Sequence, residues 1–321
     1  MPKFVQWTIL SLLGALLVTA GIYLLFFWFG TNTSAIDPAK DSFVMVDGYR
    51  MYYRYLPANG DVQPDQLPTL VLVHSEAWPS NEYDRLVKQL RGKMNVYVVD
   101  LLGYGKSDKP QRRYDTVYYE RTLREGLQQL PAKRMSLLGN SATGSIVLRI
   151  ANEQPDRYNH VVWLNPLGFG EVTLGLAAIL QIPVLGELNG LPVQSLFRLS
   201  NLQGMFTGSD LPTEQADELY NATNWYTTSR ARLAIYRNVL TPRGIAPEYT
   251  MYVEDTVRNA QVNTTLIWGE DDMYATADQA MWARELNPDR VRTVTVPDAE
   301  HNVHLINAKQ LVDPITEAVR K

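Results

Sequence analysis

The chain of 321 residues contains no cysteine. This absence excludes disulfides, a thiolate nucleophile, thiolate metal sites and iron–sulfur clusters. Long runs of one charge are also missing, and 30 basic against 34 acidic residues give a net charge of −4. A nucleic-acid-binding surface is therefore not expected, because such surfaces cluster basic side chains. Histidine is scarce, since the sequence has only four, which narrows the search for an imidazole base.

The N-terminal segment has no charged side chain from Phe4 to Ile36 and is almost wholly apolar over residues 4–29. A helix over that apolar run would be about 39 Å long, enough to cross a hydrocarbon core of roughly 30 Å. We therefore predict a transmembrane signal-anchor helix in residues 1–30, in contact with the lipid bilayer through residues 4–29. The alternative is a cleaved secretory signal ending near Ala20, but the apolar run continues well beyond that site.

The charges that flank this helix indicate its orientation. Lys3 and the amino terminus are positive, whereas Asp37, Lys40 and Asp41 follow the helix. Because positive charge is retained on the cytoplasmic side, we predict a single-pass protein whose body lies on the exported side, in a periplasm or outside the cell.

After a linker (residues 31–42), the chain alternates between strand-like and helix-like segments. Two alternating runs around Asp47-Gly48 predict a hairpin. Short apolar runs bounded by turn residues predict strands at 69–74, 96–100, 135–138, 161–164, 264–268 and 291–296. Amphipathic segments of helix length lie between most of them, at 83–90, 118–130 and 146–152. This order indicates an α/β fold with a mostly parallel central sheet and helices on both faces.

The alternation breaks between residues 167 and 258, which are first rich in Leu, Gly and Pro and then polar and aromatic, with no evident strand. We predict a helical cap here, inserted between two parts of the core at 43–166 and 259–321. Pro183 and the shortness of the apolar run around it argue against a second span. The cap is expected to line an apolar pocket or to touch the bilayer.

A serine lies at a strand-to-helix junction in residues 137–144, Leu-Leu-Gly-Asn-Ser-Ala-Thr-Gly. On a tight turn of this kind the hydroxyl points away from the sheet and the next amide faces a bound carbonyl oxygen. Small residues suit the place where strand and helix backbones pass close together. Ser141 is thus a candidate nucleophile, although the same run also fits an ordinary Gly-Ser turn.

A serine nucleophile needs a base, and on a parallel sheet the chain order is serine, acid, histidine. His74 precedes the serine, and His160 is expected at the start of a strand on the far edge. His301 and His304 both follow the last predicted strand, His301 nearer its end and His304 in the first turn of the final helix. The two could also hold a metal, but no third ligand is evident, so no metal is predicted.

The acid should follow the preceding strand, where Glu270, Asp271 and Asp272 stand in sequence. Spacing alone does not choose among these carboxylates. Two of the three are expected to be solvated loop charges.

From about Phe43 to the end, five ordered blocks resemble the α/β-hydrolase superfamily, in its serine-nucleophile branch. The blocks are His74-Ser75-Glu76, similar to the family's His-Gly oxyanion loop; residues 100–110, similar to Asp-x-x-Gly-x-Gly-x-Ser; Ser141 at the nucleophile elbow; residues 268–272, similar to Trp-Gly-x-x-Asp; and Glu300-His301, similar to Gly-His. The resemblance implies the α/β-hydrolase fold, with residues 167–258 as its variable cap. It also implies a triad in which His301 takes the proton of Ser141 and Asp272 orients the imidazole.

The resemblance further implies an oxyanion hole made by the main-chain amides of Ala142 and Glu76, on a loop supported by His74 and Ser75. No cofactor is implied. With a membrane anchor and an apolar cap, the expected function is hydrolysis of a small hydrophobic carboxyl ester through an acyl-enzyme, as in carboxylesterases and lipases. Serine at position 141 disfavours the dehalogenase and epoxide-hydrolase branches, whose chemistry begins with a carboxylate.

Two alternatives stay open. Residues 139–141 and 165–170 are also similar to stretches of carbon–carbon bond hydrolases that act on ring-cleavage products. In addition, Ser75, Thr143 and Glu300 stand where the family has glycine. Thr143 places a β-branched side chain at a close approach, and Glu300 is expected to raise the pKa of the neighbouring base. If these changes impair catalysis, the domain would serve as a membrane-tethered binding or assembly subunit with a protein partner.

Overall fold

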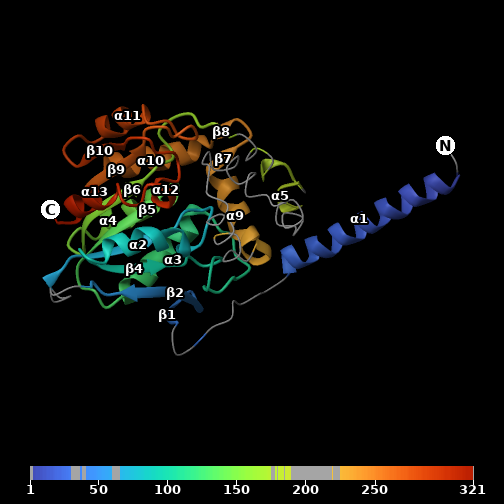
Figure 1. Ribbon diagram of the computed structural model, residues 1–321, viewed down its shortest axis with the longest axis horizontal. Coiled ribbons are helices and arrows are strands. Elements are labelled where there is room, and N and C mark those ends of the chain that lie inside the picture. The colour runs from blue at the N-terminus through green and yellow to red at the C-terminus, as the bar shows by residue number, and fades with distance from the viewer. Residues whose placement is uncertain are drawn as a thin grey trace.

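A computed structural model describes residues 3–29, 37, 41–59, 66–174, 178, 180–183, 185–188, 219 and 225–320 (Figure 1). An eight-stranded sheet forms the centre, in the order β1-β2-β4-β3-β5-β6-β9-β10. Its strands are β1 (Ser42–Val46), β2 (Tyr49–Leu56), β3 (Thr69–Val73), β4 (Asn95–Val99), β5 (Met135–Asn140), β6 (Tyr158–Leu164), β9 (Asn263–Gly269) and β10 (Val291–Val296). The six strands from β4 to β10 in this order are parallel, and β1 and β2 add an antiparallel edge. The predicted α/β fold with a mostly parallel sheet is confirmed.

Helices cover both faces of the sheet. Those of the described body are η2 (Ser80–Tyr83), α2 (Asp84–Leu90), α3 (Thr116–Gln129), α4 (Thr143–Glu153), α10 (Pro247–Arg258), α11 (Gln279–Glu285), α12 (Val303–Ile306) and α13 (Val312–Arg320). One core cluster packs the sheet against α3, α4, α10 and α11, and a second packs it against α2, α12 and α13. Successive residues of β3 alternate between the two clusters. Both faces of the strand are therefore buried, which explains its uninterrupted apolar sequence.

The predicted strands and helices agree with the structure apart from their ends. The hairpin turns at Asp47 and Gly48, both with positive φ, as a two-residue turn requires. Strand β6 begins three residues earlier than the apolar run that predicted it and includes His160. It lies between β5 and β9, so the expectation of an edge strand for His160 is wrong.

The N-terminal helix α1 (Lys3–Phe29) projects from the body as a long rod (Figure 1). Among the described residues it is the one helix long and apolar enough to cross a membrane, and no residue of its span Val5–Ile22 is buried in the protein. Its C-terminal part contacts α5 (Leu185–Leu188) and α9 (Trp225–Val239). Leu24 packs there against Leu180 and Leu233, as does Tyr236, so the apolar helix joins the body at the predicted cap.

The described part of the predicted cap is mainly helical, in α5, α9 and α10, although α10 also packs against the sheet. Between α9 and α10 lies a short antiparallel pair, β7 (Leu240–Thr241) and β8 (Gly244–Ile245). The expectation of a strand-free cap is wrong in this detail. Residues 189–218 lie outside the described residues, so the predicted limits of the cap stay a prediction.

Candidate active site

Ser141 lies on the turn between β5 and α4, at the carboxyl edge of the sheet, and is buried. Its φ of 53° is unusual for a residue other than glycine. Neighbouring groups hold this conformation, since the Ser141 amide donates to Leu164 O at 2.9 Å and Trp163 Nε1 donates to Ser141 O at 2.6 Å. A positive φ held in this way is the geometry of a nucleophile elbow.

Thr143 does not crowd the elbow as its β-branched side chain led us to expect. Its hydroxyl donates to Asn140 O at 2.8 Å and accepts from Asn140 N at 3.2 Å, closing the turn. The close approach of strand to helix is instead between Gly139 and Gly144, where a Cβ added to Gly139 would lie 2.6 Å from Gly144 Cα.

Replacing Gly144 with alanine should destabilise the domain. The added Cβ would lie 1.9 Å from Cδ1 of Trp163, whose side chain is fully buried. Overpacking of this kind costs about 3 kcal/mol of unfolding free energy. Urea denaturation of the variant and the wild type checks this value, and a loss below about 1 kcal/mol would contradict the tight contact.

The structure brings His301 and Asp272 together. His301 lies after β10 and Asp272 after β9, and these parallel strands are neighbours, so both side chains emerge at the same edge. His301 Nδ1 is 2.8 Å from Asp272 Oδ2. Glu270 and Asp271 are exposed, whereas Asp272 is buried, so the geometry selects Asp272 as the partner of His301.

The Asp272 carboxylate is fully occupied by donors. Oδ1 accepts from the amides of Tyr274 and Ala275, each at 2.9 Å. Oδ2 accepts from His301 and from Asn165 Nδ2 at 3.0 Å. Burial raises the pKa of Asp272, but His301 and these donors outweigh it and hold the pKa below its usual value. The carboxylate therefore stays ionised at neutral pH and orients the imidazole through Nδ1.

The pKa of His301 is raised. Burial alone would lower it, but the charge of Asp272, followed by that of Glu76 and Glu82, outweighs burial. These three acids make the largest contributions that raise it, and the predicted effect of Glu300 on the same pKa stays a prediction.

His304 does not face Ser141. It lies in α12, fully buried, with its ring 5.2 Å from that of Tyr83 and its Nε2 3.6 Å from Glu82 Oε2. Among the described residues no three or more acidic and histidine side chains are grouped so that they could hold a metal ion.

The loop after β3 is held by two residues that the sequence singled out. His74 Nε2 accepts from the Leu101 amide at 2.9 Å, so its proton is on Nδ1, which lies 2.6 Å from Ser75 O. Ser75 donates its amide and its hydroxyl to the two oxygens of Glu82, each at 2.8 Å. Its hydroxyl also accepts from the Ala77 amide. Serine thus supplies contacts at this position that glycine lacks.

The Glu76 carboxylate lies at the place where the resemblance predicts that a substrate oxyanion binds. Ser141 Oγ donates to Glu76 Oε1 at 3.1 Å, and the Ala142 amide donates to Oε2 at 3.2 Å. The amide of Glu76 also stabilises the charged carboxylate. The two amides expected to bind a substrate oxyanion therefore face an acidic side chain of the protein. With its hydroxyl directed at Glu76, Ser141 makes no hydrogen bond to His301.

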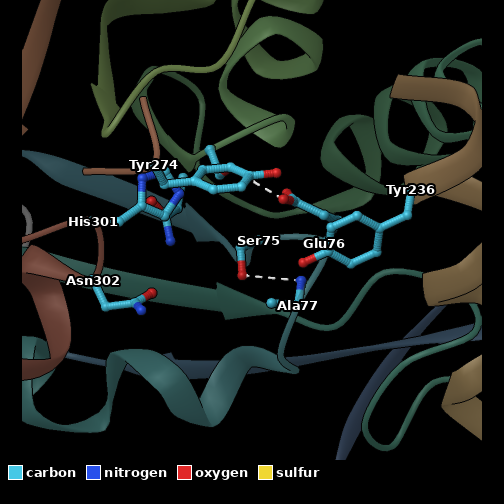
Figure 2. A pocket seen from close by; sticks show the side chains of 9 residues that line it. Ser75, Glu76, Ala77, Tyr236, Tyr274, His301 and Asn302 are labelled. Atoms are coloured by element: carbon cyan, nitrogen blue, oxygen red, sulfur yellow. Dashed lines mark hydrogen bonds between the residues drawn. The ribbon is translucent and has the colours of Figure 1, made fainter. Parts of the chain in front are cut away.

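These groups line one small pocket, and Figure 2 shows Glu76 reaching into it between Tyr236 and Tyr274. The remaining lining residues are Ser75, Ala77, Asn140, Ser141, His301 and Asn302. The Tyr274 ring stands edge-on to His301, with centroids 4.9 Å apart. Ser141, His301 and the Glu76 carboxylate therefore share one site.

Sequence reasoning missed three contributors. Asn165, with a φ of 41°, follows β6 directly and binds Asp272, and its place after a strand next to β9 was an available signal. Tyr236 comes from the cap, where no sequence pattern marked it. For Glu76 the sequence assigned a role only to the main-chain amide.

Comparison with known proteins gives the family. Residues 70–313, more than half of the chain, match the alpha/beta hydrolase family. A haloalkane dehalogenase of Mycolicibacterium paratuberculosis is 34% identical over 108 residues, 33% of this chain and 36% of the relative. The chain spans less than half the length of the curated relatives it matches.

Solved structures share the fold. A meta-cleavage product hydrolase from Pseudomonas fluorescens superimposes with a TM-score of 0.64 at 17% identity, covering 87% of this chain and 97% of the other. A membrane phospholipase A, described as a bacterial virulence factor, gives a TM-score of 0.62 at 18% identity and covers all of both chains. The family match over residues 70–313 agrees with the fold, with the positive φ of Ser141 and with the buried pair of His301 and Asp272. The chain therefore belongs to the alpha/beta hydrolase family.

Proposed function

We propose that this chain is a membrane-anchored serine hydrolase that cleaves hydrophobic carboxyl esters through Ser141, His301 and Asp272. The observation that carries the proposal is the 2.8 Å contact between His301 Nδ1 and Asp272 Oδ2 in the pocket that Ser141 lines. Because Asp272 engages Nδ1, Nε2 is the nitrogen free to accept a proton.

The proposed reaction has two halves. Ser141 Oγ attacks the ester carbonyl carbon while His301 Nε2 takes the hydroxyl proton, and the alcohol leaves with that proton. A water then attacks the acyl carbon and passes a proton to His301. His301 returns that proton to Ser141 Oγ as the acyl–oxygen bond breaks, which releases the carboxylic acid and regenerates the serine. The amides of Ala142 and Glu76 would stabilise the oxyanion in both halves.

A lipid-like substrate is favoured by how the cap meets α1. Leu24 of α1 and Tyr236 of α9 pack against the same apolar pair, Leu180 and Leu233, and Tyr236 lines the pocket of Ser141. An ester dissolved in the bilayer would thus reach the site beside the anchor. Full-length likeness to a membrane phospholipase A supports the same substrate class. We further propose that the domain lies on the exported side of the membrane, because positive charge precedes the helix and acidic residues follow it.

The substrate is tested with p-nitrophenyl esters of increasing chain length, compared with a vinylogous diketone acid. We expect kcat/KM to rise with acyl length and to depend on Ser141. Turnover of the diketone without ester cleavage would contradict the proposal and favour carbon–carbon hydrolysis, the second candidate, which rests on the likeness to the meta-cleavage product hydrolase.

A third candidate is a tethered binding subunit without catalysis, and the Glu76 carboxylate in the oxyanion position favours it. A fluorophosphonate probe separates the two classes, because it requires an activated serine. A folded protein that the probe never modifies would support the binding subunit.

Removing residues 1–36 should release the body from membranes, because residues 5–22 of α1 have no contact that buries them in the protein. We expect the truncated chain in the soluble fraction after ultracentrifugation and the full chain in the membrane pellet. Continued pelleting of a folded truncated chain would instead indicate that the cap binds lipid by itself.

A further inference from the structure

The oxyanion position is already filled. The Glu76 carboxylate accepts from Ser141 Oγ and from the Ala142 amide, at 3.1 and 3.2 Å. With Glu76 in this place the remaining cavity measures about 10 Å³. This is room for roughly one water molecule and not for an ester group.

We propose that the Glu76 side chain gates the oxyanion hole, so that a substrate carbonyl must displace its carboxylate from Ala142 and Ser141 before reaction begins. The inference rests on the proposed function, since a gate has meaning only if Ser141 is a nucleophile.

Two physical reasons make the filled hole inactive. A serine hydroxyl has one proton, so while Ser141 donates it to Glu76 it cannot donate it to His301. An oxyanion forming beside an ionised carboxylate would also be repelled, whereas the hole works by presenting donors alone. Displacement of the carboxylate removes both obstacles, because the Ala142 and Glu76 amides then face the substrate.

Among the described residues no cation forms a salt bridge with the Glu76 carboxyl. The titratable groups that interact with it come from several elements: His301, Tyr274, Tyr236, Tyr104, Tyr249 and Tyr83. Burial raises the pKa of Glu76, against the lowering effects of its own amide, His301 and Ser141. The Tyr274 hydroxyl is buried without a partner in the described part of the chain, so the pocket holds a free donor for a displaced carboxylate.

The test measures the second-order rate of fluorophosphonate labelling of the full chain in detergent, for the wild type, Glu76→Ala and Glu76→Gln. Alanine removes the carboxylate and keeps the main-chain amide. Glutamine keeps the shape but has a single acceptor oxygen for the two donors. We expect both variants to react at least about tenfold faster than the wild type, a change of about 1.4 kcal/mol in the barrier. Glu270→Gln, which removes an exposed charge from the loop of Asp272, is the matched control and should react like the wild type.

The pH dependence of the labelling rate provides a second measurement, which would not change if Glu76 only supported the fold. Glu76 raises the pKa of His301, so removing its charge should shift the acid limb of the labelling rate to lower pH in Glu76→Gln but not in Glu270→Gln. If the wild type is labelled at Ser141 and both Glu76 variants react at the same rate or more slowly, the gate is wrong while the serine hydrolase stands. If the wild type and both folded variants stay unlabelled, the proposed function fails and the gate with it.

Discussion

Replacing Ser141 with alanine should lower kcat for a p-nitrophenyl ester by a factor on the order of 10⁶. The substitution removes the only atom that can form the acyl-enzyme, and what remains is catalysis by the oxyanion amides and by binding. The alanine should retain the fold, because the Ser141 side chain makes one hydrogen bond, to Glu76, and its main-chain contacts stay.

A second buried serine provides the control. Ser136 lies at the opposite end of β5 with a hydroxyl that has no partner among the described residues. Ser136→Ala removes a hydroxyl from the same strand and should leave kcat unchanged within about twofold. Equal activity in Ser141→Ala and the wild type would show that Ser141 is not the nucleophile.

Asp272→Asn should lower kcat by about 10⁴ while leaving the domain folded. The amides of Tyr274 and Ala275 both donate to Oδ1, so the amide oxygen of an asparagine must stay at that position. Its NH₂ then takes the place of Oδ2 and points a donor at His301 Nδ1. The imidazole responds by carrying its proton on Nε2, the tautomer that cannot accept the proton of Ser141.

The control for this substitution is Asp271→Asn, one residue away on the same loop and exposed. It removes the same charge without touching His301, and kcat should change less than about threefold. A loss below tenfold in Asp272→Asn would mean that another group orients the imidazole.

Most of the fold follows from the sequence because both faces of the sheet are buried. Such strands have continuous apolar sequences, and both ends of β10 agree with the predicted range 291–296. The ends of β6 and α3 differ from prediction because polar residues such as His160 continue an element that hydrophobicity alone cuts short. His160 lies in β6, and its ring forms a hydrogen bond with Thr265 on the neighbouring strand. The local sequence pattern does not predict this contact.

The site is predicted less completely than the fold. The chain order of serine, acid and histidine is enough to suggest Ser141, Asp272 and His301, because parallel strands bring their carboxyl ends to one edge. The direction of the Glu76 side chain is not predictable in this way, since it depends on donors from Ser141 and Ala142, on the turn between β5 and α4, which is distant in sequence. Thr143 appeared unfavourable for a similar reason, because the close contact involves Gly139 and Gly144 instead.

The most direct test of the central claim is peptide mapping by mass spectrometry after the full chain reacts with a fluorophosphonate. We predict one modified peptide, carrying the phosphonyl group on Ser141, and its loss in His301→Asn, where the hydroxyl has no base. Modification of a different serine, or equal modification of Ser141 with and without His301, would contradict the claim that Ser141, His301 and Asp272 act as one unit.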